Sequence, residues 1–142
     1  QFCGKDREER VPDSLGRDML DIMPSMGLIG HQWRKHGSCS GLTQEDYLQA
    51  TRAAYDRIKL PDDIALGKSS KIRSIDDIET AFISANPSME KQGIAVTCEG
   101  RKMEEVRICM TKDLTFRRCP EVDRKGAAQT TPKSRLSAKL KR

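Results

Sequence analysis

Apolar residues recur at helical spacing in two segments, and both segments carry start and stop signals. The first segment lies between a polar run at 43–46, similar to a capping box, and Pro61. Its apolar positions are Tyr47, Leu48, Ala54, Tyr55 and Ile58. The second begins after the N-cap candidate Ser74 and ends at Asn86, with one stripe of Ile75, Ile78, Phe82 and Ala85. The pattern predicts two amphipathic helices, with a loop over 61–73 between them.

After Pro87 the pattern of apolar residues changes from helical to alternating. Residues 94–98 read as a strand, 99–101 as a turn, and Val106, Ile108 and Met110 as one face of a second strand. A third strand is predicted at 114–117, after a turn at 111–113. Residues 1–22 form a polar connection with some helical tendency. Helices followed by antiparallel strands predict an α+β domain in which helices pack against an antiparallel sheet.

The residue types with the most chemistry lie close together. Residues 31–39, with the sequence HQWRKHGSC, contain both histidines and the only tryptophan of the chain. In a helix, at about 100° per residue, His31 stacks with Lys35, and Gln32 stacks with His36 beside them. The four polar side chains then share one flank of the helix.

The other residues of this segment fit a short amphipathic helix over about 28–37. Trp33 continues round the helix as an apolar anchor, and Arg34 points away as a solvated charge. Gly37 is a natural helix stop. The segment therefore predicts a helix that is anchored on one side and carries polar groups on another.

Two imidazoles and an ammonium group suit proton transfer near neutral pH around a phosphate. Two other interpretations compete with this one. Each histidine could be a structural hydrogen-bonding group. His31, His36 and Cys39 could also bind zinc, but the histidines are five positions apart, about 140° round a helix, whereas helical zinc pairs are four apart. The spacing therefore disfavours a metal site.

Residues 31–39 resemble the second active-site segment of the ribonuclease T2 family, usually His-Glu-Trp-x-Lys-His-Gly-Thr-Cys. The resemblance covers roughly residues 1–127 and is closest to bacterial members. Other short stretches also resemble the family and occur in the expected order. They lie at 2–4, 23–25, 47–48, 95–98, 106–109 and 118–120. It implies a ribonuclease T2-like α+β fold.

The resemblance also implies cleavage of single-stranded RNA by transphosphorylation, in which the ribose 2′-hydroxyl attacks its own phosphate and leaves a 2′,3′-cyclic phosphate. His36 matches the acid/base histidine, His31 a phosphate-contacting histidine, and Lys35 the cation that stabilises the transition state. Gln32 belongs to the same catalytic set, and Trp33 to the substrate-binding set. No metal or other cofactor is implied. The expected partner is RNA, and we expect a monomer that does not bind membranes.

Two departures from the family bear on activity. Gln32 replaces the usual glutamate, and it brings no negative charge to favour protonated His36. The first active-site segment, of the type Phe-Thr-Ile-His-Gly-Leu-Trp-Pro, is absent, and with it the partner histidine. We therefore expect an N-terminally incomplete ribonuclease, weakened or inactive as this fragment. The alternatives are a catalytically impaired RNA-binding relative and a secreted interaction protein on the same fold.

Five cysteines in 142 residues favour an oxidising compartment, and the expected location is secreted or periplasmic. The family pattern implies disulfides between Cys3 and Cys39 and between Cys109 and Cys119, which leaves Cys98 over. No apolar run approaches the length of a membrane span.

Charge separates the end of the chain from the rest. Residues 132–142 carry five cations and no anion, which equals the whole formal net charge of +5. Such a tail attracts RNA without sequence preference, or is simply a solvated, disordered end. We therefore expect one partial ribonuclease T2-like domain over 1–131 and a disordered basic tail over 132–142.

Overall fold

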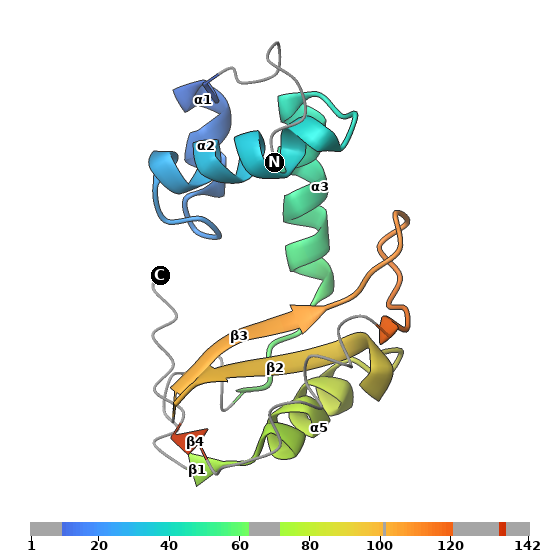
Figure 1. Ribbon diagram of the computed structural model, residues 1–142. Helices are drawn as coiled ribbons and strands as arrows, with labels where there is room; N and C mark the ends of the chain where they lie inside the picture. Colours follow the sequence, from blue (N-terminus) through green and yellow to red (C-terminus); the bar gives the residue numbers. More distant parts are fainter. Residues whose placement is uncertain (1–9, 63–71, 101, 121–133, 136–142) are drawn as a thin grey trace. The chain divides into compact units, whose positions relative to one another are not determined.

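The computed structural model describes residues 10–62, 72–100, 102–120 and 134–135 (Figure 1). The chain divides into two compact units. The N-terminal unit runs to Arg57, and the C-terminal unit begins at Ile58. The single domain expected over residues 1–131 stays a prediction.

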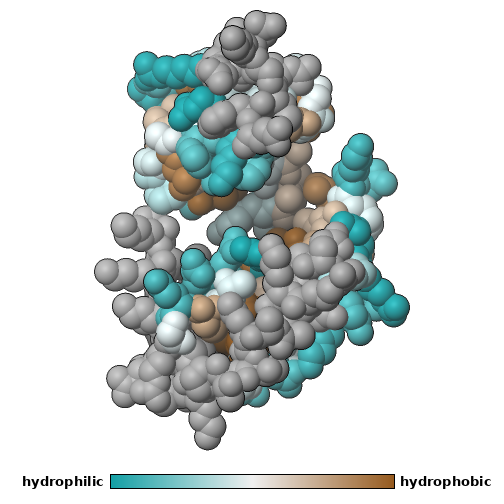
Figure 2. Space-filling model, viewed as in Figure 1, coloured by the Kyte–Doolittle hydropathy of each residue, from teal (hydrophilic) through white to brown (hydrophobic). Residues whose placement is uncertain are grey.

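The N-terminal unit is helical. Its elements are α1 (Asp13–Gly16), η2 (Arg17–Met19), α2 (Met26–Lys35), η3 (Gly37–Cys39) and α3 (Gln44–Arg57). Their apolar faces meet in one core of Val11, Met19, Met23, Ile29, Trp33 and Leu48. Hydrophilic and hydrophobic side chains both reach the described surface around these helices (Figure 2). The helix predicted at about 28–37 is confirmed as α2, shifted two residues toward the N-terminus.

Side-chain caps fix where the two longer helices of this unit begin. The Ser25 hydroxyl accepts a hydrogen bond from the Leu28 amide at 3.1 Å and caps α2. The Thr43 hydroxyl accepts from the Asp46 amide at 3.1 Å and donates to the Asp46 carboxylate at 2.8 Å. The capping signal at 43–46 is therefore confirmed as the start of α3.

Helix α3 ends at Arg57, before the predicted stop at Pro61. The reason lies in the C-terminal unit, where the side chain of Asn86 binds the backbone of Lys59 on both sides. The Asn86 carbonyl oxygen accepts from the Lys59 amide, and the Asn86 amide group donates to the Lys59 carbonyl, each at 2.8 Å. These bonds replace helical ones, and Ile58 and Leu60 pack against the C-terminal core.

In the described part of the C-terminal unit, a helix packs against one face of a two-stranded antiparallel sheet (Figure 1). Its elements are β1 (Ile72–Arg73), α5 (Ile75–Ala85), η4 (Lys91–Gly93), β2 (Ile94–Glu99), β3 (Lys102–Ile108) and β4 (Ser134–Arg135). The core is formed by Ile78, Phe82, Met89, Ile94 and Val96. Ser74 and Asp77 form a reciprocal capping box at the start of α5. The predicted helix at 75–85 and hairpin over 94–108 are confirmed, as is the α+β class.

Two details of the prediction are wrong. The third strand expected at 114–117 is a tight loop, because Leu114 has φ of 59° and only Met110 and Phe116 form an isolated bridge. Hydrogen bonds between residues close in sequence replace strand pairing in this loop. For example, the Thr111 amide donates to the Thr115 carbonyl at 2.8 Å. The predicted loop at 61–73 ends in a strand, since Ile72 and Arg73 pair with Arg135 and Ser134. Residues 136–142 of the expected basic tail lie outside the described residues.

Candidate active site

The polar groups predicted to share one flank lie at the C-terminal end of α2. His31 and Lys35 are exposed and lie one turn apart within the helix, and Gln32 is half-buried. His36 is exposed and forms the C-cap, with φ of −124° and ψ of −50°. Its amide still donates to the Gln32 carbonyl at 2.9 Å, so the i,i+4 relation of Gln32 and His36 is kept. The predicted grouping of the four residues is therefore present in the backbone.

The side chains of His31, Lys35 and His36 are exposed, and that of Gln32 is half-buried. In the part of the chain that the structure describes, no side-chain hydrogen bond or ion pair joins any two of these four residues. An exposed ammonium and two exposed imidazoles at a helix end can bind a phosphate and exchange protons with it. The roles assigned to His31, Gln32, Lys35 and His36 stay predictions.

Trp33 lies on the opposite side of α2, in the core. Its side chain is 4% exposed, and its ring meets that of Tyr47 edge to face with centroids 5.7 Å apart. Burial also raises the pKa of the Tyr47 phenol. The position of Trp33 agrees with the predicted apolar anchor, and its predicted contact with substrate stays a prediction.

Arg34 is half-buried, so it is less solvated than the pattern indicated. A Cβ atom on Gly30 would lie 3.1 Å from Arg34 Nη1, which places the guanidinium over the preceding turn of α2. The carbonyl of Arg34 accepts a hydrogen bond from the buried Ser38 hydroxyl at 2.7 Å. The sequence reasoning missed Ser38, although its place directly after the helix stop was the available signal.

The cysteines follow the predicted pattern in part. Cys109 and Cys119 form a disulfide that closes the loop after β3, as predicted. Cys39 is also disulfide-bonded, and its predicted partner Cys3 lies outside the described residues. Cys98 is a half-buried thiol in β2. The oxidised pairs agree with an environment in which disulfides persist.

No group of three or more His, Cys, Asp or Glu side chains among the described residues is arranged to hold a metal ion. No described helix has the length and apolar character needed to cross a membrane. A pocket of about 300 Å³ in the N-terminal unit contains none of the predicted catalytic residues. It is lined by Leu15, Asp18, Met19, Glu45, Leu48, Gln49 and Arg52.

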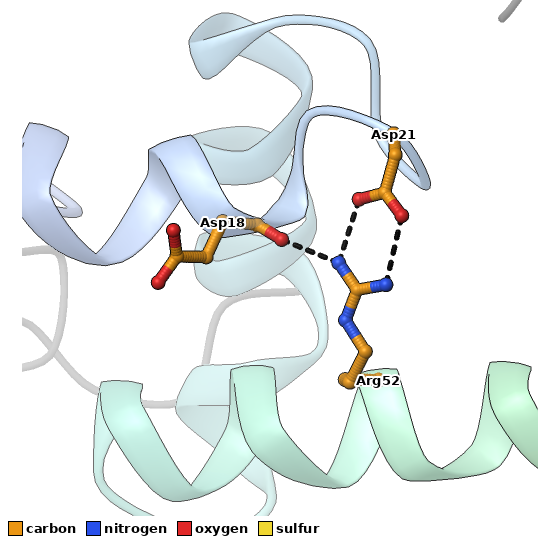
Figure 3. A network of polar contacts seen from close by, with 3 residues as sticks. All are labelled: Asp18, Asp21 and Arg52. Atoms are coloured by element: carbon orange, nitrogen blue, oxygen red, sulfur yellow. Dashed lines mark hydrogen bonds and ion pairs between the residues drawn. The ribbon is translucent and has the colours of Figure 1, made fainter.

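Two of these lining residues, Asp18 and Arg52, belong to a network of polar contacts with Asp21 that the sequence pattern did not indicate (Figure 3). The Arg52 guanidinium donates to both carboxylate oxygens of Asp21, at 2.6 and 2.8 Å, and to the backbone carbonyl of Asp18. The hydrogen bonds and charge of Arg52 lower the pKa of Asp21. Asp21 and Arg52 are 31 residues apart, so no local pattern could have paired them.

Residues 3–119 match the ribonuclease T2 family, so this chain belongs to that family. A ribonuclease of Aeromonas hydrophila is 42% identical to the chain over 41 residues. Those residues make up 29% of this chain and 19% of that protein, so the match spans about a fifth of the relative's length. No solved structure matches the chain.

Proposed function

We propose that this chain carries one half of the active site of an endoribonuclease that cleaves single-stranded RNA by transphosphorylation. The observation that supports the proposal best is the exposed set of His31, Lys35 and His36 at the end of α2, in a chain that belongs to the ribonuclease T2 family. In this reaction the 2′-hydroxyl attacks the neighbouring phosphorus while the bond to the departing 5′-oxygen breaks. The products are a 2′,3′-cyclic phosphate and a free 5′-hydroxyl.

Each polar group has a distinct role in the proposed reaction. His36 exchanges a proton with the reacting oxygens, and His31 holds a non-bridging phosphate oxygen. Lys35 stabilises the charge that builds up on the pentacoordinate phosphorus. Gln32 donates a hydrogen bond from its amide group but carries no charge. DNA has no 2′-hydroxyl and should not react.

We expect this chain to cleave RNA slowly, because the reaction needs two groups for proton transfer. This sequence has two histidines, and both are already assigned. A positioned acid or base contributes about 10²- to 10⁴-fold, so we expect cleavage slower by that factor than at a site with both groups. Secretion or a periplasmic location is proposed on the basis of the disulfides.

The test is cleavage of a short single-stranded RNA by the chain in the presence of a chelator. We expect His36→Ala and Lys35→Ala to abolish product, and the matched variants Lys59→Ala and Arg57→Ala, exposed residues outside α2, to retain it. Equal loss in all four variants would contradict the proposal. RNA binding without cleavage would instead support the alternative of a catalytically impaired RNA-binding relative.

A further inference from the structure

The backbone of Lys35 and His36 is held on both sides. The Arg34 carbonyl lies directly before these two residues, and Gly37, which begins η3, lies directly after them. The last carbonyls of a helix have no partner inside the helix, so their orientation depends on what else binds them. At this end of α2, the partner of the Arg34 carbonyl is the hydroxyl of Ser38.

Ser38 is well placed to hold this carbonyl still. Its side chain is 2% exposed, and its hydroxyl oxygen lies 2.7 Å from the Arg34 carbonyl oxygen. The Arg34 carbonyl belongs to the same planar peptide unit as the Lys35 amide. A bond to that carbonyl therefore fixes the plane from which Lys35 departs.

On the C-terminal side, the backbone is held by the contact between Gly37 and the core. A Cβ atom on Gly37 would lie only 2.9 Å from Trp33 Cζ3 and from Tyr47 Cδ1, so the backbone rests directly against both rings. The carbonyl of His36 also accepts the Cys39 amide at 3.1 Å. His36 is thus held on its C-terminal side by packing and on its N-terminal side through the Ser38 bond.

We propose that Ser38 is a positioning residue, which orients Lys35 and His36 toward one phosphate through its bond to the Arg34 carbonyl. This inference rests on the proposed function. The Ser38 hydroxyl touches neither the substrate nor the reacting atoms. Its loss should therefore lower the rate of the chemical step more than the affinity for substrate. Misplacing a reacting group by about 1 Å can cost about 10²-fold in rate.

The first experiment needs no activity. The two histidines give two ring Cε1–H signals in a carbon–proton NMR spectrum, which His31→Gln and His36→Gln variants assign. We expect Ser38→Ala to shift and broaden the His36 signal and Ser38→Thr, which keeps the hydroxyl, to restore it. An unchanged His36 signal in Ser38→Ala would overturn the inference, whether or not the chain cleaves RNA.

Thr51 provides a matched control. Its hydroxyl donates to the Tyr47 carbonyl at 2.9 Å, the same bond across four residues, but within α3. We expect Thr51→Ala to leave the His36 signal unchanged. An equal effect of Thr51→Ala would mean that Ser38 stabilises the fold in general, and would overturn the inference. If Ser38→Ala fails to fold, the comparison is made between Ser38→Thr, which keeps the hydroxyl, and Ser38→Val, which has the same shape without it.

The second experiment measures kinetics. We expect Ser38→Ala to lower kcat by about 10- to 100-fold with KM changed less than about twofold, and Ser38→Thr to recover most of kcat. A loss confined to KM would overturn the inference. Absence of cleavage in every variant would contradict the proposed function instead, and the NMR result would still decide the role of Ser38.

Discussion

Gln32 is one of two residues at which the site departs from the usual motif of its family, the other being Ser38 in place of threonine. It is half-buried on α2, and the His36 amide binds its carbonyl. A glutamine in this place can donate and accept hydrogen bonds, but it cannot favour a protonated imidazole by charge. The departure bears on how fast the proposed reaction runs, and a single substitution tests it.

We expect Gln32→Glu to raise kcat on RNA by about tenfold, which corresponds to about 1.4 kcal/mol of barrier. The reason is that a carboxylate beside His36 stabilises the charged imidazole. Steady-state kinetics on a short RNA measure the change. Gln49→Glu, which makes the same charge change on the exposed surface of α3, serves as the control. Equal turnover in Gln32→Glu and the unmodified chain would count against the role of this position.

Gly37 is the residue whose lack of a side chain the site requires most directly. We expect Gly37→Ala to destabilise the chain by about 1–3 kcal/mol, because the added methyl group meets the rings of Trp33 and Tyr47. Gly27 lies in the first turn of α2 with open space around it, the nearest atom being Ser25 Oγ at 3.9 Å. Gly27→Ala should therefore stabilise by about 0.5–1 kcal/mol. Denaturant unfolding of both variants checks the contrast, and a Gly37→Ala chain as stable as the parent would refute it.

At the scale of elements, local signals predicted most of what the structure contains. Capping signals at Thr43 and Ser74 each predicted the start of a helix, and α3 and α5 begin there. The cap at Ser25 was not predicted, and α2 begins two residues before its predicted start. Alternation over 94–108 predicted a hairpin, since its inward positions Ile94 and Val96 fill a core with α5. The reason these predictions succeeded is that each depends on neighbours within a few residues.

The predictions that failed depend on distant partners. The end of α3 is set by Asn86, which lies 27 residues beyond Lys59 in the sequence. The strand at 72–73 exists through pairing with 134–135. The pattern of residues 114–117 predicted a third strand of the sheet, but the positive φ of Leu114 turns the chain back within loop 109–119. In the candidate site, the sequence predicted that four polar residues share one flank of α2. It did not predict the hydrogen bond from the Ser38 hydroxyl to the Arg34 carbonyl.

Asn86 joins the end of α5 to the segment that follows α3. Its side chain is 4% exposed and bonds to the carbonyls of Lys59 and Phe82 and to the Lys59 amide. We expect Asn86→Ala to destabilise the chain by about 2–3 kcal/mol, because buried backbone groups lose their partners. Thermal or denaturant unfolding measures the loss. Ser84→Ala, on the exposed side of α5, should change stability by less than about 0.5 kcal/mol. Equal effects of the two variants would show that the Asn86 bonds do not contribute.

The Arg52–Asp21 pair ties α3 to the turn that follows η2 (Figure 3). Because Arg52 lowers the pKa of Asp21, the pair stabilises the fold above the usual aspartate pKa of about 3.8 and loses this effect as pH falls through the lowered pKa. Both side chains reach solvent, so the effect is small. We expect Asp21→Asn to unfold at slightly lower denaturant near neutral pH, and to match the parent chain in strong acid. A difference that persists in strong acid would contradict this.

At the scale of the whole molecule, the family match and the excess positive charge lie in different parts of the chain. The family match covers 3–119, and the basic residues of 132–142 account for the formal net charge of +5. The rest of the chain is neutral on balance, and Lys35 is the cation among the four residues of the proposed site. We therefore expect salt-dependent attraction to RNA through residues 132–142 to be separate from the proposed chemical step.

In the proposed reaction, the end of α2 assists cleavage by the substrate's own 2′-hydroxyl. The most direct measurement is the identity of the new ends, read by mass spectrometry after incubation of a defined RNA with the chain and a chelator. We expect 2′,3′-cyclic phosphate and 5′-hydroxyl ends, which are lost with His36→Ala and absent when the reacting nucleotide is 2′-deoxy. New 5′-phosphate ends, or equal cleavage of the 2′-deoxy substrate, would contradict it.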